Sequence, residues 1–289
     1  MKKKLLSFGH GYSAEALEKI LDPNIWEISA TTRTVDKAKK IAARNIKTYI
    51  WPGDDISAEI RDATHILSSI PPNEFGDLVL ESYSGLIKEA KHLKWIGYLS
   101  TTGVYGDHKG NWVNESTPLS PTTKRGQYRV IAERQWMGLV ENSKIPLCIF
   151  RLAGIYGPGR GPFVKVSKGT AKRIIKKGQV FSRIHVEDIA RVLLASINMP
   201  GKSGIYNVCD DLASPPEDVL TYAAMLLEKE QPPEIDFLSP KLSKMVRSFY
   251  SECKRVENQK IKRELGIELK YSNYKIGLRN LLKDEGIIS

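Results

Sequence analysis

The chain has 289 residues, of which 41 % are hydrophobic and 27 % are charged, so its composition is that of a folded globular protein. These values argue against a disordered chain and a fibrous repeat. The apolar run after the N-terminal lysines ends at Phe8, which is too short for a signal peptide or a membrane span. The net charge of +11 raises nucleic acid, an anionic membrane or a phosphate-rich ligand as partners.

Cysteine and histidine spacing argues against disulfides and metal sites. The three cysteines stand far apart without a C-x-x-C pair, and the five histidines show no metal-ligand spacing. No nucleic-acid-binding motif accompanies the positive charge. We therefore expect a soluble, cytoplasmic protein with no metal, no membrane association and no nucleic-acid partner. The cysteines are Cys148, Cys209 and Cys253.

Short apolar runs alternate with segments of helical periodicity through the first half of the chain. Such alternation implies crossover connections and predicts an α/β fold, a Rossmann-type doubly wound parallel sheet. The predicted strands are 5–8, 26–30, 47–51, 65–70, 95–99 and 146–152, and the predicted helices are 14–21, 35–43, 77–90 and 123–140.

The second half is less regular and predicts a smaller, mostly helical substrate lobe. A Gly/Pro cluster precedes a basic stretch, Lys165–Lys177, which predicts a helix that is either a solvated face or attracts a diphosphate-bearing substrate. We expect residues 1–156 and 179–210 to form a dinucleotide-binding domain, and residues 157–178 and 211–289 to form the lobe. Later predicted elements are a helix at 186–199, a strand at 205–208, a helix from 216 to 228 and a charged helical tail.

A glycine turn joins the first predicted strand to the first predicted helix. It has the pattern G-x-G-x-x-A, the alanine-ended form of the dinucleotide fingerprint. Gly9 permits the tight turn, and Gly11 lets a diphosphate approach the backbone N–H groups that Tyr12 and Ser13 present at the helix start. Ala14 keeps the helix close to the strand. The alternative is a tight strand-to-helix turn without a ligand.

The tip of the second strand favours NADP over NAD. An NAD site usually carries a carboxylate there, whereas this chain has Thr32 and Arg33. A guanidinium can bind a 2′-phosphate with two hydrogen bonds. Alternatively, Arg33 is a solvated surface residue and NAD is the cofactor.

Further contacts to the cofactor are predicted where the third and fourth strands end. Ser69, Ile70 and Pro71 lie at the carboxyl edge of the sheet, where they either shape the loop beneath a ribose or only terminate the strand. Asp54 either accepts a hydrogen bond from the adenine amine or lies in a solvated turn.

Four further segments resemble one family. They are 99–106 (LSTTGVYG), 151–159 (RLAGIYGPG), 183–190 (RIHVEDIA) and 206–208 (YNV). In this order they are similar to motifs of extended short-chain dehydrogenases/reductases, the NAD(P)-dependent epimerase/dehydratase family. The glycine turn departs from that group's usual G-x-x-G-x-x-G, which points to an atypical branch.

The resemblance implies a catalytic site with an altered acid/base pair. It places Thr101 where a hydroxyl orients the reacting oxygen, and Ser100 beside it near the cofactor. Arg125 and Arg129 stand where the family has Tyr and Lys. Their i,i+4 spacing puts them on one helix face, so both are expected to reach toward the cofactor ribose or a substrate anion. An arginine stays protonated and cannot replace a phenol as proton donor. Tyr128 is the candidate displaced acid/base, because nearby guanidinium groups favour a phenolate; the alternative is a structural tyrosine.

Two functions follow from this sequence. The first is an NADP-dependent oxidoreductase or epimerase/dehydratase-like enzyme acting on a small polar substrate, such as a sugar nucleotide or a phosphorylated compound. The second is a non-catalytic NADP-binding redox sensor or regulatory protein, which the missing Tyr/Lys pair favours. The resemblance also implies a homodimer formed through the two long helices.

Overall fold

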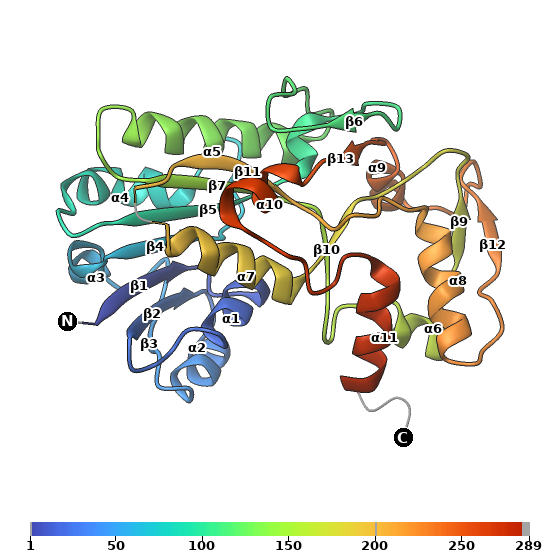
Figure 1. Cartoon of the computed structure of the whole chain (residues 1–289), viewed down its shortest axis with the longest axis horizontal. Helices are drawn as coiled ribbons and strands as arrows, with labels where there is room; N and C mark the ends of the chain where they lie inside the picture. The colour runs from blue at the N-terminus through green and yellow to red at the C-terminus, as the bar shows by residue number, and fades with distance from the viewer. Residues whose placement is uncertain (1, 200, 285–289) are drawn as a thin grey trace.

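A computed structural model describes residues 2–199 and 201–284 and contains a seven-stranded parallel sheet at its centre (Figure 1). The strand order is β11-β7-β5-β4-β1-β2-β3, so the order reverses between β1 and β4. This arrangement confirms the predicted Rossmann-type fold. The strands are β1 (Lys3–Phe8), β2 (Trp26–Thr32), β3 (Lys47–Ile50), β4 (His65–Ser68), β5 (Trp95–Thr101), β7 (Leu147–Leu152) and β11 (Gly204–Val208).

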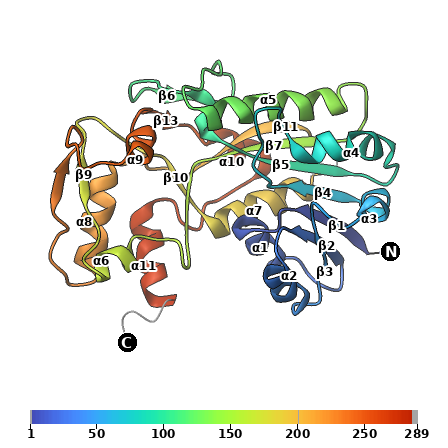
Figure 2. The ribbon, with the colours of Figure 1, turned by 180° about the vertical axis from the view of Figure 1, so that it is seen from behind.

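Helices cover both faces of the sheet (Figures 1 and 2). One face packs against α1 (Tyr12–Glu18), α2 (Val35–Ala42) and α7 (Val186–Ile197), and the other against α3 (Ser57–Asp62), α4 (Leu78–Glu89) and α5 (Lys124–Val140). The strands are apolar on both sides because both faces are covered. No helix within 2–199 and 201–284 combines the length and apolar character needed to cross a bilayer.

A smaller lobe lies beyond the carboxyl ends of the strands, at the right of Figure 1. Its own apolar core includes Tyr156, Phe163, Tyr222 and Leu278. The lobe contains α6 (Phe163–Ser167), β9 (Arg173–Ile175), α8 (Pro216–Leu226), β12 (Glu234–Asp236), α9 (Lys244–Phe249) and α11 (Tyr274–Asp284). The remaining short elements are η1 (Thr102–Tyr105), β6 (Trp112–Val113), β8 (Gly154–Tyr156), β10 (Arg183–His185) and β13 (Arg255–Val256). Helix α10 (Gln259–Leu265) packs against β11 and α7.

The predicted helix at Lys165–Lys177 is wrong. The helix α6 ends at Ser167, Gly169 adopts a φ of +65°, and β9 then pairs with β12 in a parallel ladder. Arg173 stabilises this pairing, since its Nε donates to the carbonyl of Pro232 at 2.8 Å and its Nη2 lies 3.0 Å from a Glu234 carboxylate oxygen. The basic side chains therefore do not form one continuous helical face.

Candidate functional site

The glycine turn brings the ends of β1, β2 and β4 together. Gly9 has a φ of +69°, and its N–H donates to Thr31 Oγ1 at 2.9 Å. A Cβ atom at Gly9 would lie 2.7 Å from Ile70 Cγ1 at the end of β4. Only glycine fits both this backbone conformation and this close approach. The turn thus lies at the point where the strand order reverses, the usual ligand position in an open α/β sheet.

Gly11 leaves open space above the start of α1. It is the N-cap residue of α1, has an extended backbone, and as a glycine has no side chain of its own to cap the first N–H groups of the helix. The nearest atom to a Cβ placed on Gly11 would be the Gly9 oxygen, at 3.5 Å. A phosphate group fits this arrangement, because it needs open space and backbone N–H donors.

His10 holds the glycine turn against α1, a role that the sequence did not predict. Its ring is 1 % exposed and bonds to Ser7 Oγ at 3.1 Å through Nδ1 and to Glu18 Oε2 at 2.8 Å through Nε2. Arg44 also binds the Glu18 carboxylate, with Nε 2.7 Å from Oε1. Burial lowers the pKa of His10. The ring therefore ties the turn to α1 in its neutral form.

The residues predicted to bind the adenosine end lie along the ends of β2 and β3. Thr32 is buried and its carbonyl accepts the Trp51 N–H at 2.8 Å, while Arg33 is exposed. The Asp54 carboxylate accepts the N–H of Ile50 at 2.7 Å and so closes the turn after β3. Arg33 and Asp54 are both exposed, and of these two the Asp54 side chain is held by its bond to Ile50.

At the end of β4, Ser69 binds the protein backbone. Its hydroxyl donates to the carbonyls of Phe8 at 3.0 Å and Gly9 at 2.7 Å, which joins β4 to β1 at the turn. Ile70 fills the space left by the missing side chain of Gly9, and Pro71 is exposed. Residues 69–71 therefore form the surface of the protein beside the glycine turn.

The start of α5 packs against the segment that carries Thr101. Thr101 is half-buried, and its Oγ1 accepts the N–H of Gly103 at 3.1 Å. A Cβ at Gly126 would lie 2.8 Å from the Gly103 oxygen. Arg129 donates from one nitrogen, Nη1, to the Leu99 carbonyl at 2.5 Å, so its guanidinium lies at the end of β5. The structure thus brings Thr101 and Arg129 to the same strand end.

The other two candidate residues of α5 differ in exposure. Arg125 is exposed, whereas Tyr128 is half-buried, as is Arg129. Arg129 makes a second hydrogen bond, from Nη1 to Tyr98 Oη at 3.1 Å.

Within the described chain, no group of three His, Cys, Asp or Glu side chains is arranged to hold a metal ion.

A buried polar network supports this strand end, and the sequence did not predict it. The Glu133 carboxylate accepts two bonds from Arg151, at 3.1 Å from Nε and 2.7 Å from Nη2, and one from Ser100 Oγ at 2.5 Å. Arg151 Nη1 also donates to Tyr105 Oη at 2.9 Å, and Tyr105 donates to Asn207 Oδ1 at 2.7 Å. One network therefore links α5, β5, β7, η1 and β11.

This network gives three of the four resemblance motifs a structural role, because its residues come from segments 99–106, 151–159 and 206–208. Burial raises the pKa of Tyr105 to about 12, so this phenol stays protonated near neutral pH. The Ser100 hydroxyl donates a hydrogen bond to the Glu133 carboxylate, and Ser100 directly precedes Thr101 in β5. Tyr105 and Ser100 thus position the end of β5.

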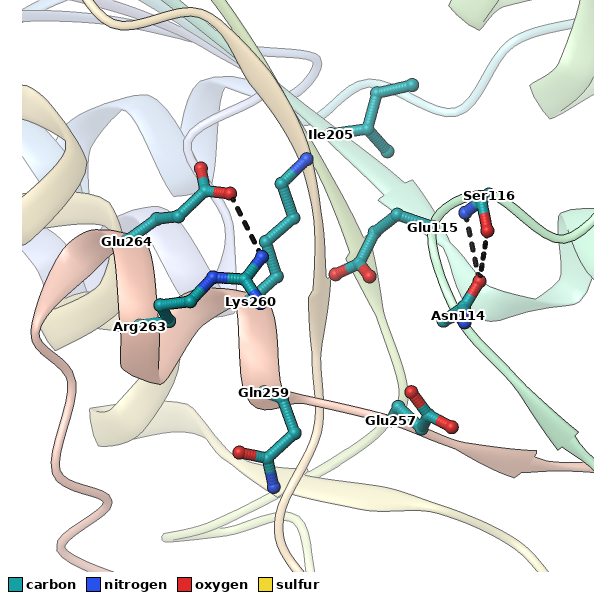
Figure 3. Close-up of a pocket in the computed structure, with 9 residues that line it drawn as sticks. All are labelled: Asn114, Glu115, Ser116, Ile205, Glu257, Gln259, Lys260, Arg263 and Glu264. Atoms are coloured by element: carbon teal, nitrogen blue, oxygen red, sulfur yellow. Dashed lines mark hydrogen bonds and ion pairs between the residues drawn. The ribbon is translucent and has the colours of Figure 1, made fainter.

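A pocket of about 480 Å³ lies at the edge strand β11, between α10 and the loop after β6 (Figure 3). Its wall includes Glu115, whose Oε1 accepts the N–H of Asn207 at 2.8 Å. None of the residues predicted to bind cofactor or substrate lines this pocket. The lining residues are Asn114, Glu115, Ser116, Ile205, Glu257, Gln259, Lys260, Arg263 and Glu264.

Comparison with known proteins identifies several similar chains. Residues 68–209 match the model of the NAD dependent epimerase/dehydratase family. Protein YeeZ of Escherichia coli K12 is 27 % identical over 285 residues, covering 93 % of this chain and 96 % of YeeZ. A solved structure of a functionally unknown conserved protein from Silicibacter pomeroyi is 51 % identical with a TM-score of 0.91, covering 99 % of this chain and 100 % of that one.

A more distant solved structure shares the fold. The UDP-glucuronic acid 4-epimerase of Bacillus cereus, in complex with UDP-glucuronic acid and NAD, has a TM-score of 0.76 at 16 % identity. The similarity covers 98 % of this chain and 99 % of the epimerase.

Proposed function

Because the chain belongs to the NAD-dependent epimerase/dehydratase family, we propose that it binds a nicotinamide dinucleotide at the glycine turn and acts on a small polar substrate. The observation that carries this proposal is the open space above Gly11, beside the left-handed turn at Gly9. The diphosphate lies over Gly11, where it accepts hydrogen bonds from backbone N–H groups.

NADP is the proposed cofactor. Arg33 extends into solvent at the end of β2, and no carboxylate is present in the strand tip from Ala30 to Arg33. A free guanidinium at this position suits the 2′-phosphate that distinguishes NADP from NAD. Asp54 contributes less to adenine binding, since its carboxylate already accepts the N–H of Ile50.

Replacing Arg33 with alanine is expected to weaken NADPH binding roughly tenfold, through loss of charge-assisted hydrogen bonds to the 2′-phosphate. NADH affinity should change less than about twofold, because NADH lacks that phosphate. Fluorescence titration of both reduced nucleotides measures the effect, with Arg61→Ala as an exposed-arginine control. Tighter binding of NADH that does not respond to Arg33→Ala would refute the NADP preference.

The proposed reaction is an oxidoreductase or epimerase-like conversion at the end of β5. The bound cofactor would supply hydride transfer. Thr101 orients the substrate oxygen with its hydroxyl, and Arg129, fixed on the Leu99 carbonyl, holds a ribose hydroxyl or a substrate anion. Tyr128, one position before Arg129 on α5, is the proposed proton donor and acceptor.

A redox sensor is the second candidate, and one observation favours it. Arg125 stands where the family has its tyrosine, and its side chain is exposed. The usual phenol is therefore missing from this position. A protein of this kind would bind the nucleotide and change its contacts to a partner without turnover. The two candidates differ in whether Tyr128 has a chemical role.

Replacing Tyr128 with phenylalanine separates the two functions. If Tyr128 is the acid/base, turnover should fall about 100-fold or more, while nucleotide affinity stays within about twofold. The assay follows product formation from UDP-glucuronic acid or dTDP-glucose as trial substrates by chromatography, because an epimerase-like cycle returns the hydride and leaves no net change in reduced nicotinamide. Tyr83→Phe is a control at another half-buried tyrosine. Unchanged turnover in Tyr128→Phe would remove the residue from the mechanism, and nucleotide binding without turnover by the wild-type protein would favour the sensor.

Sugar nucleotides or phosphorylated compounds are the proposed substrate class. The Bacillus cereus epimerase with the same fold holds UDP-glucuronic acid. The positive net charge of +11 suits an anionic substrate, which long-range attraction would bring to the protein faster.

We also propose that the protein is a cytoplasmic homodimer. All three cysteines are buried and free, as expected in a reducing compartment. A groove of about 330 Å³ runs between α4 and α5, with Leu80 on one side and Leu139 on the other, and a second copy of this pair of helices would cover it. Sedimentation velocity that finds only monomer at micromolar concentrations would reject the dimer.

A further inference from the structure

A four-residue hairpin of the lobe contacts the glycine turn. It spans residues 157–160 and is called here the strap. Gly157 N–H donates to the Arg160 carbonyl at 3.1 Å, and Arg160 N–H donates back to the Gly157 carbonyl at 2.9 Å. Tyr12, the first residue of α1, donates its hydroxyl to the Pro158 carbonyl at 3.0 Å. The strap is thus a closed turn fixed to the residue that follows Gly11.

The glycines of the strap match this contact. Gly157 has a φ of +152°, and a Cβ there would lie 2.5 Å from the Tyr12 hydroxyl oxygen and 2.7 Å from Val186 Cγ1. Gly159 has a φ of +69°, the left-handed region that glycine adopts without strain. A side chain at Gly157 would therefore push the strap away from Tyr12.

Arg160 carries a positive charge to the same place. Its guanidinium carbon lies 5.7 Å from the centroid of the Tyr12 ring, and its side chain is exposed. No ion pair joins Arg160 to a carboxylate in the described part of the chain. The nearby acidic residues of α1 have other partners, since Glu15 pairs with Lys37 and Glu18 with Arg44.

We propose that Arg160 binds the diphosphate of the dinucleotide and that the strap covers this group once the nucleotide is bound. This inference rests on the proposed function. The glycine turn itself supplies only neutral N–H donors, whereas a diphosphate carries negative charge on both phosphates. The Arg160 guanidinium, which forms no ion pair with the described residues and lies over the ring of Tyr12, provides charge-assisted hydrogen bonds to such a group. The substrate lobe thereby contributes a residue to the cofactor site.

The test compares Arg160→Gln with wild type for two ligands, NADPH and adenosine 2′-monophosphate. NADPH affinity should fall roughly tenfold in Arg160→Gln, and Arg160→Lys should recover part of the loss. Adenosine 2′-monophosphate has no diphosphate, so its affinity should not change in Arg160→Gln. Lys165→Gln on α6 is the charge-matched control, since it removes an exposed cation of the same lobe. Thermal unfolding confirms that each variant is folded.

The possible outcomes separate this inference from the proposed function. Equal NADPH affinity in wild type and Arg160→Gln overturns the role of Arg160 and leaves the cofactor proposal intact. An equal loss for both ligands also overturns it, because the contact would then not be to the diphosphate. A wild-type protein that binds neither NADPH nor NADH refutes the proposed function and this inference with it.

Discussion

Replacing Glu133 with glutamine is expected to lower the free energy of unfolding by about 3–5 kcal/mol, because Arg151 then keeps its charge without a counter-ion in the interior. The Arg151 side chain is 3 % exposed and that of Glu133 is 0 % exposed. Water therefore cannot replace the lost carboxylate. Urea unfolding followed by circular dichroism measures the change as a shift of the midpoint at constant slope.

Two comparison variants sharpen this prediction. Asp62→Asn removes one partner of the exposed Lys4–Asp62 pair, whose side chains are 42 % and 66 % exposed, and should cost less than about 1 kcal/mol. Changing Glu133 and Arg151 together to methionine removes both charges and should cost less than Glu133→Gln alone. A loss below about 1 kcal/mol in Glu133→Gln would mean that Arg151 is solvated in solution and that the network is not closed.

The strand and helix order could be predicted because each of its signals is local. The apolar runs, the periodic segments and the glycine turn all lie within short stretches of the chain, and the structure places them in one Rossmann-type sheet. The buried network could not be predicted in this way. Glu133, Arg151 and Asn207 come from different elements, and the sequence does not show that a helix carboxylate faces a strand guanidinium.

The prediction of a helix at Lys165–Lys177 is wrong for a related reason. Its lysines favour a helix locally, but Ile174 and Ile175 pair with β12, which lies about 60 residues further along the chain. The same limit applies to Ser69. Its place at the carboxyl edge of the sheet was predictable, whereas its bonds to the Phe8 and Gly9 carbonyls depend on the register of β1 and β4.

Replacing Gly11 with valine is expected to lower dinucleotide affinity by about 100-fold or more without unfolding the protein. Gly11 has φ −114° and ψ −163°, an extended conformation that any residue adopts, and a Cβ there meets no atom closer than 3.5 Å. The added Cβ therefore fits the apo protein, and the methyl groups that it carries extend into the space proposed for the diphosphate. Fluorescence titration with NADPH, together with thermal unfolding, measures both properties.

Gly9→Ala is the matched variant with the opposite expected result. Its φ of +69° costs an alanine roughly 1–2 kcal/mol, and the new Cβ would lie 2.7 Å from Ile70 Cγ1, so the folded state itself loses stability. The two variants thus separate the need for room for the ligand from the need for a left-handed backbone. Gly11→Val should lose NADPH binding at normal stability, whereas Gly9→Ala should lower the stability of the fold. If Gly11→Val binds NADPH as tightly as the wild type does, the diphosphate lies elsewhere and the proposed site is contradicted.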